Sequence, residues 1–396
     1  MIRKREHVDM ITVSSNLSEG DYINGVDGAF VVDCTNNCGA SSTMEIYASK
    51  LYEKYLLRLV VEITGDLNES AMSNKIDVLD TLVTAHTSIG ELISLRPDSI
   101  FDINESLSQA IESIRNTEKL LIKTNFGNID GFAGGLTRGE ITIVGGRPGH
   151  GKSTMLLNLL SNILASKRKV LLFNRELTNV EVLKKLLALE SGRLSYAMIR
   201  QGMYDIKQLQ ELDRVRDYIA KKYNPKHFRM YDQIRDFPAS ATEIKKFKPD
   251  VIFDDYIQLI TPTGKEDQRR LQLERIVNDY KWIAKEYNCV VILASQLNRA
   301  LETRGNPQPQ LSDLAESGAI EQVAENVFFV YYPYKVPATA KPENKNQLVL
   351  VAAKVRYGET GAIQMAYDGD KCKMYNNEDE LFVPPMTEKQ QDEIPF

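Results

Sequence analysis

Apolar residues between Met44 and Leu59 recur at intervals of three and four, the spacing that places side chains on one face of a helix. The stretch from Thr64 to Asn68 interrupts this pattern, and a second helical period runs from Leu79 to Ile93. Because Arg96-Pro97 favours a stop, the pattern predicts an antiparallel helical hairpin over residues 43–96. Residues 1–42 show no clear period and are rich in Asn, Ser and Gly, so we expect an irregular segment there.

A third helical stretch begins at Asn104 and places Leu107, Ile111 and Ile114 on one side. Its length fits a linker helix within residues 97–122. An isolated amphipathic helix has nothing of its own to cover such a stripe. The helix therefore docks either on its own domain or on a neighbouring subunit, and the sequence leaves both open.

From residue 141 onward, short continuous apolar runs alternate with helical periods. Continuous apolar runs are typical of strands that are covered on both faces. The alternation predicts an α/β fold with a mostly parallel sheet between helices over residues 123–375. A hairpin around Tyr367-Asp368-Gly369-Asp370 ends this domain. The strand-like runs are 141–144, 170–173, 251–253, 290–293, 327–331 and 348–352.

The formal net charge of the 396 residues is −5, and this charge is unevenly placed. Residues 376–396 hold six acids and one base, which accounts for the whole excess, and we expect them to form an acidic disordered tail. The body is near neutral, so it binds a polyanion only where Lys and Arg side chains line one surface.

No apolar stretch has the length of a membrane span, and no apolar segment follows the basic start Met1–Arg5. Cys34 and Cys38 form C-x3-C, but two further ligands at short spacing are missing. Free thiols in a reducing cytosol are therefore favoured over a metal site. We expect a cytoplasmic protein without a membrane partner.

The stretch from Gly146 to Ser153 reads G-x-x-x-x-G-K-S, between an apolar run and a helix-compatible run. In this setting backbone N–H groups and the start of the helix surround a phosphate. Lys152 would reach the β- and γ-phosphates and Ser153 would hold Mg²⁺, so the pattern predicts ATP and Mg²⁺ as ligands. A glycine-rich turn that binds nothing is the alternative. The predicted nucleotide-binding residues are Gly146, Arg147, Pro148, Gly149, His150, Gly151, Lys152, Ser153 and Thr154.

Polar residues follow three of the predicted strands. The apolar run 251–253 ends in Asp254-Asp255, whose side chains must point to opposite faces, and we favour Asp255 for the metal. No glutamate follows directly, so Glu176, at the end of the run 170–173, is the candidate general base. The alternative for Glu176 is a solvated acid that caps the next helix. The stretch Val291–Gln296 ends in Gln296, which would sense the γ-phosphate, since ligands bind at this edge of open α/β sheets.

These motifs occur in an order that resembles the DnaB-type replicative DNA helicases, a RecA-like hexameric family. The resemblance covers about residues 98–375, and a weaker likeness in the hairpin suggests a shortened N-terminal domain. It is carried by the glycine-rich loop, by Glu176 and by the stretches 255–259, 295–299, 311–322 and 353–358.

The resemblance implies a RecA-like core assembled as a ring of six, with ATP held between subunits. It also implies that Lys354 and Arg356 belong to the neighbour's catalytic site, where a cation stabilises charge on the γ-phosphate. Without the resemblance, a surface salt bridge is the favoured interpretation of Arg356. The family commonly has methionine where this chain has His150.

The resemblance further implies single-stranded DNA in the central channel and movement from 5′ to 3′. Two loops, Thr263–Arg270 and Glu302–Gly318, would hold the strand through side chains and backbone N–H groups. Ala315 stands where the family often has arginine, so one charge contact per subunit is absent. The candidate DNA contacts are Lys265, Arg269, Arg270, Arg304, Glu316 and Gly318.

The chain ends in Ile394-Pro395-Phe396 after acidic residues, similar to the tail of bacterial single-stranded-DNA-binding proteins. Such a tail would dock on a replication partner such as a primase or a helicase loader. A solvated disordered tail is the alternative, and both remain open.

The first functional hypothesis is an ATP-driven hexameric replicative DNA helicase of a bacterial cell or a phage-infected host. The alternatives are a RecA-fold ATPase without helicase activity, such as a recombination filament protein, and a loader or interaction module of the replisome.

Overall fold

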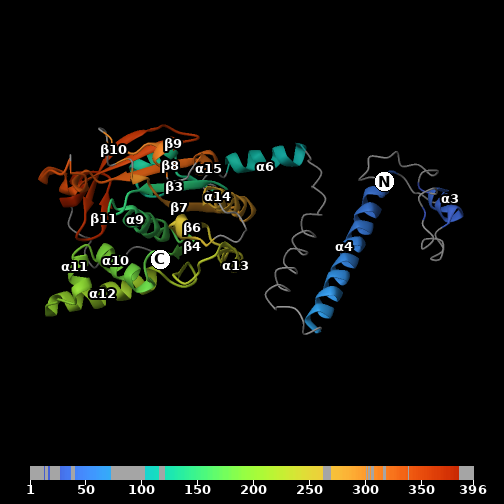
Figure 1. Ribbon diagram of the computed structural model, residues 1–396, viewed down its shortest axis with the longest axis horizontal. Coiled ribbons are helices and arrows are strands. Elements are labelled where there is room, and N and C mark those ends of the chain that lie inside the picture. The colour runs from blue at the N-terminus through green and yellow to red at the C-terminus, as the bar shows by residue number, and fades with distance from the viewer. Residues whose placement is uncertain are drawn as a thin grey trace. The chain divides into compact units, whose positions relative to one another are not determined.

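The computed structural model (Figure 1) describes the ranges 27–36, 41–72, 103–115, 121–261, 269–299, 307–314, 318–337 and 339–382, with a few single residues besides. The chain divides into two compact units, Met1–Ser106 and Leu107–Phe396. The division falls within the stretch predicted as a linker.

The first unit contains helices α3 (Gly28–Asn36) and α4 (Ser41–Met72). Helix α3 corrects the expectation of an irregular segment over residues 1–42. It begins directly after Asp27, whose carboxylate accepts a hydrogen bond from the N–H of Phe30 at 2.8 Å, and such a contact stabilises a helix start.

Helix α4 also corrects the predicted break at Thr64–Asn68, because it continues through Gly65 to Met72. The Thr64 hydroxyl donates to the carbonyls of Val60 and Val61 at 2.8 and 2.9 Å, so this side chain bonds within the helix instead of ending it. One glycine costs only about 1 kcal/mol inside a helix. The second half of the predicted hairpin lies outside the described residues.

Helix α6 (Ile103–Arg115) lies where the third helical period predicted a helix. Its apolar residues Leu107, Ile111 and Ile114 are each at least half exposed. The stripe is therefore exposed within the described part of a single chain.

The second unit is built on a nine-stranded sheet in the order β11-β10-β9-β8-β3-β7-β6-β4-β5. The six strands from β8 to β5 run parallel, and β9, β10 and β11 extend the sheet in antiparallel fashion. The prediction of an α/β fold with a mostly parallel sheet is confirmed. The strands are β3 (Ile141–Gly146), β4 (Val170–Asn174), β5 (Phe228–Tyr231), β6 (Val251–Asp255), β7 (Val290–Gln296), β8 (Asn326–Tyr331), β9 (Gln347–Val355), β10 (Gly361–Asp368) and β11 (Lys373–Tyr375).

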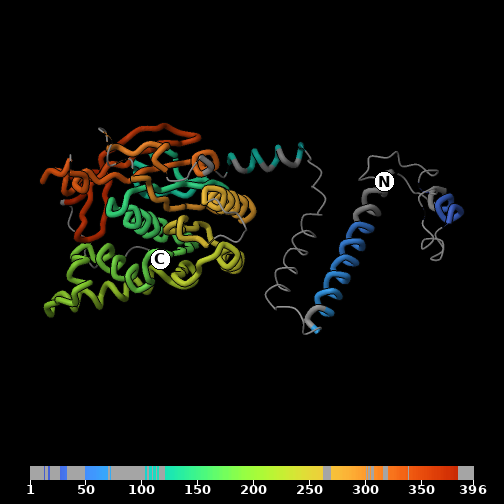
Figure 2. The backbone as a smooth tube through the Cα atoms, in the orientation of Figure 1, coloured from blue at the N-terminus to red at the C-terminus, as the bar shows by residue number. Residues whose placement is uncertain are grey.

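Helices cover both faces of this sheet. Side chains alternate along each strand, so Val251 and Phe253 face one core while Ile252 faces the other. Helices α9 (Lys152–Ala165), α10 (Asn179–Ser191) and α12 (Ile206–Lys222) pack on the first core. Helices α13 (Phe237–Phe247), α14 (Arg269–Glu286) and α15 (Gly318–Val323) pack on the second. In Figure 2 the orange and red trace of β8–β11 lies at one side of this unit and the green trace of α10–α12 at the other.

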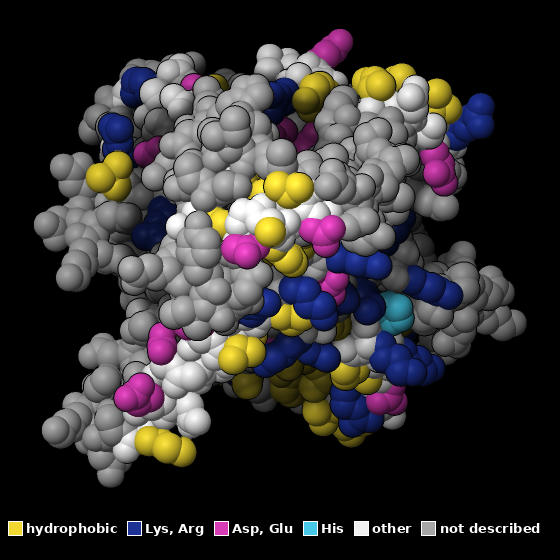
Figure 3. All heavy atoms as spheres, turned by 90° about the vertical axis from the view of Figure 1, so that its right-hand side faces the viewer, with side chains coloured by type: hydrophobic (Ala, Val, Ile, Leu, Met, Phe, Trp, Pro, Cys, Tyr) yellow, Lys and Arg dark blue, Asp and Glu magenta, His cyan; other side chains and the backbone are white. Residues whose placement is uncertain are grey.

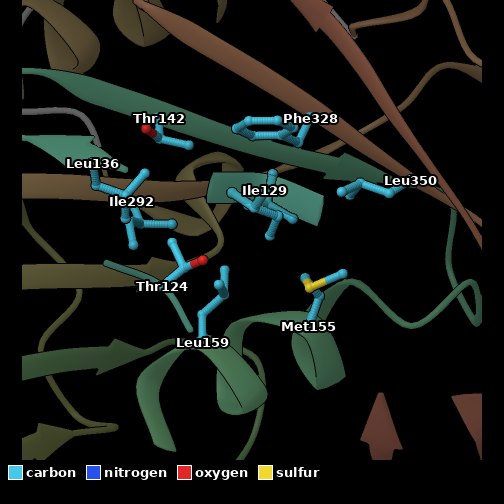
Figure 4. Close-up of a pocket in the computed structure, with 10 residues that line it drawn as sticks. Thr124, Ile129, Leu136, Thr142, Met155, Leu159, Ile292, Phe328 and Leu350 are labelled. Atoms are coloured by element: carbon cyan, nitrogen blue, oxygen red, sulfur yellow. The ribbon is translucent and has the colours of Figure 1, made fainter. Parts of the chain in front are cut away.

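A small hairpin of β1 (Leu121–Ile122) and β2 (Leu136–Thr137), with α8 (Gly127–Ala133) between its strands, covers the same face as α9. A closed space of about 10 Å³ remains where these elements meet the sheet. Figure 4 shows Met155 and Leu159 of α9 pointing into it toward Phe328 and Ile292 of the sheet. This space holds about one water-sized sphere, so it is a packing gap and no ligand site. Helix α11 (Tyr196–Gln201) follows α10 along the chain in this unit.

Candidate nucleotide and catalytic site

The glycine-rich loop lies between the end of β3 at Gly146 and the start of α9 at Lys152. Gly149 and Gly151 have φ angles of 78° and 92°, a backbone conformation that side chains with a Cβ rarely adopt. At Gly151 a Cβ would also come within 3.0 Å of the Met374 side chain. Glycine at these two positions lets the backbone turn its N–H groups toward one point, which the first turn of α9 also faces.

A cavity of about 310 Å³, the nucleotide cavity, opens over this loop. The sequence predicted many of its lining residues, from Arg147 to Thr154. Gly146 and His150 belong to the predicted set but do not line it: Gly146 pairs within the sheet, and His150 accepts a hydrogen bond from the N–H of Tyr332 at 3.2 Å. The other lining residues are Glu176, Leu177, Lys185, Tyr196, Tyr256, Gln296, Tyr367, Gly369 and Cys372.

Lys152 is buried at the floor of this cavity, with its ammonium 4.1 Å from the centre of the Tyr256 ring. Burial lowers the pKa of Lys152, and the carboxylates of Asp255 and Glu176 oppose this shift. A positive charge in so little water interacts strongly with an anion that enters the cavity.

Asp254 and Asp255 point to opposite faces of β6, as predicted. The Asp254 carboxylate is bound by Arg175 and Tyr280 in the second core. The Asp255 carboxylate lies beside Lys152 and forms a hydrogen bond with Ser153, while burial raises its pKa. Its Oδ1 atom is buried and has no hydrogen-bond partner among the described residues.

This arrangement fits a hard divalent cation. A hydroxyl and a carboxylate oxygen lie side by side, and one buried carboxylate oxygen still lacks a partner among the residues that the structure places. No group of three or more His, Cys, Asp and Glu side chains suited to a metal occurs within the part of the chain that the structure describes. Mg²⁺ commonly needs only one or two protein ligands beside substrate phosphates and water, so Ser153 and Asp255 are the residues that would hold it.

Glu176 follows the end of β4 and lines the nucleotide cavity. The next helix, α10, is capped by Thr178, whose hydroxyl accepts from the N–H of Glu181 at 3.3 Å, while the Glu181 carboxylate accepts from the N–H of Thr178 at 2.9 Å. Thr178 and Glu181 therefore cap the helix, so the alternative interpretation of Glu176 as the capping acid is wrong. Glu176 lines the cavity instead.

Gln296 ends β7 directly opposite Gly146 in the sheet register and lines the same cavity. Its N–H donates to Oε1 of Gln258 at 3.3 Å, and Nε2 of Gln258 donates to the hydroxyl of Ser295 at 3.0 Å. Gln258 lies in the short 3₁₀ turn η2 (Ile257–Leu259) after β6. The end of β7 is therefore joined to the segment that follows β6.

Lys354 and Arg356 do not line the nucleotide cavity. Val355 pairs with Asn326, the first residue of β8, so both side chains lie at the edge where β8 and β3 begin, which we call the amino edge. Arg356 donates to Glu325 at 3.1 Å, and the Glu325 carboxylate also accepts from the N–H of Ile141, the first residue of β3, at 3.0 Å. Lys354 donates to the carbonyl of Glu321 at 2.6 Å.

The predicted DNA contacts are in varied surroundings. Arg269 donates to the carbonyl of Gln258 at 2.6 Å, and Arg304 donates to Gln310 at 2.9 Å and pairs with Asp313. Both guanidinium groups are thus engaged within the chain. Arg270 is exposed at the start of α14, and Gly318 begins α15. Lys265 and Glu316 lie outside the described residues.

Another basic surface was missed by the sequence reasoning. Exposed lysines precede β4, β5 and β6 at Lys169, Lys226 and Lys248. The N–H of Val170 donates to the carbonyl of His227, and that of Asp250 donates to the carbonyl of Lys169, so these strand starts are neighbours. Figure 3 shows Lys and Arg side chains gathered beside a histidine on one part of the surface. The near-neutral body thus carries a local basic patch.

Cys289 and Cys372 are buried free thiols, and Cys372 lines the nucleotide cavity. The side chains of Cys34 and Cys38 lie outside the described residues. Over the residues that the structure describes, no helix is both long and apolar enough to cross a bilayer.

Comparison with known proteins gives a consistent set of relatives. The chain is 28% identical over 394 residues to a replicative DNA helicase, DnaC, of Bacillus subtilis, covering 96% of this chain and 86% of that protein. It is 28% identical over 400 residues to the replicative DNA helicase DnaB of Pasteurella multocida, covering 95% and 84%.

A solved structure shows the same fold. A DnaB-like replicative helicase, studied with its interactions with primase, matches with a TM-score of 0.73 at 22% identity, covering 95% of this chain and 89% of that one. A separately solved ATPase domain matches with a TM-score of 0.63 at 25% identity, covering 71% of this chain and 100% of that one. The family model described as the DnaB-like helicase C terminal domain matches residues 122–376, well over half of the chain. The chain therefore belongs to the DnaB-like helicase family.

Proposed function

We propose that this protein is a replicative DNA helicase that hydrolyses ATP between adjacent copies of the chain in a ring of six. Family membership and relatives named replicative DNA helicase, of which 84–86% is covered by the match, support the helicase over a recombination filament protein or a loader. Mg²⁺, held by Ser153 and Asp255, would screen phosphate charge and orient the γ-phosphate.

The observation that supports a shared site is the separation of Lys152 and Arg356. The glycine-rich loop follows the carboxyl end of β3, whereas Arg356 is bound to Glu325, next to the first residue of β3. The five residue steps of β3 from Ile141 to Gly146 span roughly 16 Å. Arg356 lies beside Ile141 and the glycine-rich loop follows Gly146, so Arg356 cannot reach a nucleotide on the loop of its own chain without unfolding the sheet. A neighbouring copy is the source of a guanidinium that fits this geometry.

The residues of the chain then have distinct tasks. Lys152 and the loop N–H groups bind the phosphates, and Glu176 takes a proton from the water that attacks the γ-phosphorus. Gln296 contacts the γ-phosphate and transmits its loss through Gln258. Lys354 and Arg356 of the adjacent copy stabilise the charge that develops on the γ-phosphate, an effect worth about 10³–10⁵ in rate for an arginine finger.

Mixing two inactive variants tests the shared site. Lys152→Ala chains keep Arg356, and Arg356→Ala chains keep Lys152, so a mixture contains intact sites only if the two residues come from different copies. Random 1:1 assembly around a head-to-tail ring leaves about a quarter of the sites intact. We expect ATP hydrolysis in the mixture while each variant alone is inactive.

A mixture of Lys152→Ala with Arg216→Ala is the control, because Arg216 is an exposed side chain of α12 paired with Asp213. In this mixture every chain supplies Arg356 and only the Arg216→Ala chains supply Lys152, so about half of the sites are intact. No recovery in the first mixture, with rings of mixed composition shown by mass spectrometry, would refute sharing between copies.

Single-stranded DNA as the track, with movement from 5′ to 3′, completes the proposal. Forked duplexes that carry only a 5′ or only a 3′ single-stranded arm test it, and we expect unwinding with the 5′ arm alone. A primase or a loader is the expected partner class, in the cytoplasm of a bacterial cell or an infected host. Deleting Ile394–Phe396, which lie outside the described residues, and measuring partner binding tests the role of the tail.

A further inference from the structure

A second cavity, of about 450 Å³, lies on the far side of the β10–β11 turn from the nucleotide cavity. We call it the α9–β11 cavity. By the same measure it is larger than the nucleotide cavity, so it has room for a ligand of nucleotide size. Its walls come from α9, the end of α10, α12, β11 and the 3₁₀ turn η7 (Glu378–Phe382).

Two of the three lysines in its walls already have partners. Lys222 pairs with Glu190 at 2.8 Å, and both side chains are buried. Glu190 also accepts hydrogen bonds from Ser161 and Tyr223, so its oxygens are satisfied by the protein. Lys371 pairs with Asp368 at 3.0 Å.

The third lysine, Lys373, has no ion pair or hydrogen bond within the described part of the chain. Its ammonium lies 5.4 Å from the centre of the Tyr375 ring. Burial lowers the pKa of Lys373, and the carboxylates of Glu190 and Asp368 oppose this shift. Those two carboxylates are already paired with Lys222 and Lys371, so an anion in the cavity would give the half-buried Lys373 ammonium a direct partner of its own.

The other walls provide groups that suit an aromatic ring. Tyr218, Tyr375 and Phe126 line the cavity, and the side-chain amide of Asn162 makes no hydrogen bond within the residues that the structure places. Rings that pack on a base and an amide that reads its edge are the usual elements of nucleotide recognition.

We propose that the α9–β11 cavity is a second nucleotide site, in which Lys373 holds a phosphate and Tyr218 and Tyr375 pack against the base. The proposal is independent of the helicase activity, because none of these residues takes part in hydrolysis.

The two cavities share a wall at Asn158. Its Oδ1 accepts from the N–H of Met374 at 3.0 Å, and its Nδ2 donates to the carbonyls of Thr154 and Cys372 at 2.8 and 3.0 Å. Thr154 and Cys372 line the nucleotide cavity, so a ligand that shifts β11 acts on the residues that hold ATP. Any coupling of the two sites through this shared wall would act equally in both directions.

Equilibrium dialysis of the full-length protein with radiolabelled ADP tests the site. We expect wild-type chains to bind two equivalents of ADP and Lys373→Met chains to bind one at the same ADP concentration. The affinity of the α9–β11 cavity for ADP should fall about ten-fold or more in Lys373→Met, because the variant loses a charge-assisted contact with phosphate. Lys221→Met is the matched control, an exposed lysine in the same helix as Lys222, and should retain two. Tyr218→Ala, on a different wall, should weaken the second site alone.

Thermal unfolding shows whether each variant is folded, and we expect no loss of stability in Lys373→Met because it removes an unpaired charge. Saturation of folded wild type at one equivalent would overturn the proposal, as would two equivalents of unchanged affinity in Lys373→Met. A parallel dialysis with added inorganic phosphate distinguishes a site for a whole nucleotide from a site for phosphate alone. Displacement of the second ADP by phosphate at equal concentration would overturn the assignment to a nucleotide.

Discussion

Arg175 and Asp254 form an ion pair whose two side chains are fully buried, with Nη2 and Oδ2 2.7 Å apart. A second contact joins Nε to Oδ1 at 2.7 Å, so the pair is bidentate. Each partner directly precedes a residue of the proposed catalytic site, Glu176 and Asp255. The pair thus fixes the ends of β4 and β6 from the face of the sheet opposite the nucleotide cavity.

Asp254→Ala should lower the free energy of unfolding by about 3–5 kcal/mol, because it leaves the Arg175 charge buried without a counter-ion. Denaturant unfolding measures this. Asp213→Ala is the control, since Asp213 forms an exposed pair with Arg216, and should cost about 1 kcal/mol or less. Equal losses in the two variants would contradict the role of the buried pair.

Lys152→Ala should reduce ATP hydrolysis by at least about 10²-fold, because it removes the buried ammonium that meets the transferred phosphoryl group. The steady-state rate with single-stranded DNA present is the measurement. Lys226→Ala is the control, because it replaces an exposed lysine that does not line the nucleotide cavity, and it should hydrolyse ATP at the wild-type rate. Wild-type turnover by a folded Lys152→Ala protein would show that the phosphates bind elsewhere.

Gln258→Ala should keep basal ATP hydrolysis and lose most of its stimulation by single-stranded DNA. The amide of Gln258 joins Ser295 and Gln296 at the end of β7, while its carbonyl accepts from Arg269 at the start of α14. Removing the amide cuts the contact between Gln296, the proposed γ-phosphate sensor, and the segment before α14. The rate with and without DNA tests this, with exposed Asn278→Ala as the control. Undiminished stimulation in Gln258→Ala would exclude this route.

Glu140→Gln should stabilise the protein at neutral pH and not in acid. Burial, together with the Glu325 carboxylate, raises the pKa of Glu140 above its usual value of 4.5. The folded state therefore favours the protonated form, and this stability is present below pH 4.5 and lost as pH rises through the raised pKa. We expect a higher Tm than wild type at about pH 7 and no gain near pH 4. A gain of equal size at both values would exclude the charge of Glu140 as the cause.

Local patterns in the sequence predicted the parts of the site that depend on local geometry. The glycine-rich loop requires left-handed glycines between a strand and a helix, and adjacent aspartates on a strand must diverge, so Lys152 and Asp255 could be placed from the sequence. Residues that distant segments of the chain bring into the site could not be predicted in this way. Tyr367 and Cys372 reach the nucleotide cavity only because the β10–β11 turn packs on α9.

Other differences arise from partners that composition does not reveal. Gly65 reads as a helix breaker, but the Thr64 hydroxyl bonds back to the helix and α4 continues. Arg269 and Arg304 resemble phosphate contacts in the sequence, yet neighbouring carbonyl, amide and carboxylate groups engage them. Strand β5 has only four residues, of which Phe228 alone is buried, so its apolar pattern was too weak to predict a strand.

The positions of Lys152 and Arg356 at opposite ends of β3 restrict how copies of this chain can associate. The shared site proposed above joins the carboxyl end of β3 in one copy to the amino edge of the next copy. Such a head-to-tail contact is heterologous, so each added subunit repeats it, and the series ends only when the rotation closes on the first copy. In this scheme an open row of copies leaves one nucleotide site incomplete, at the end where Lys152 has no neighbouring Arg356, and one unused Arg356 at the other end.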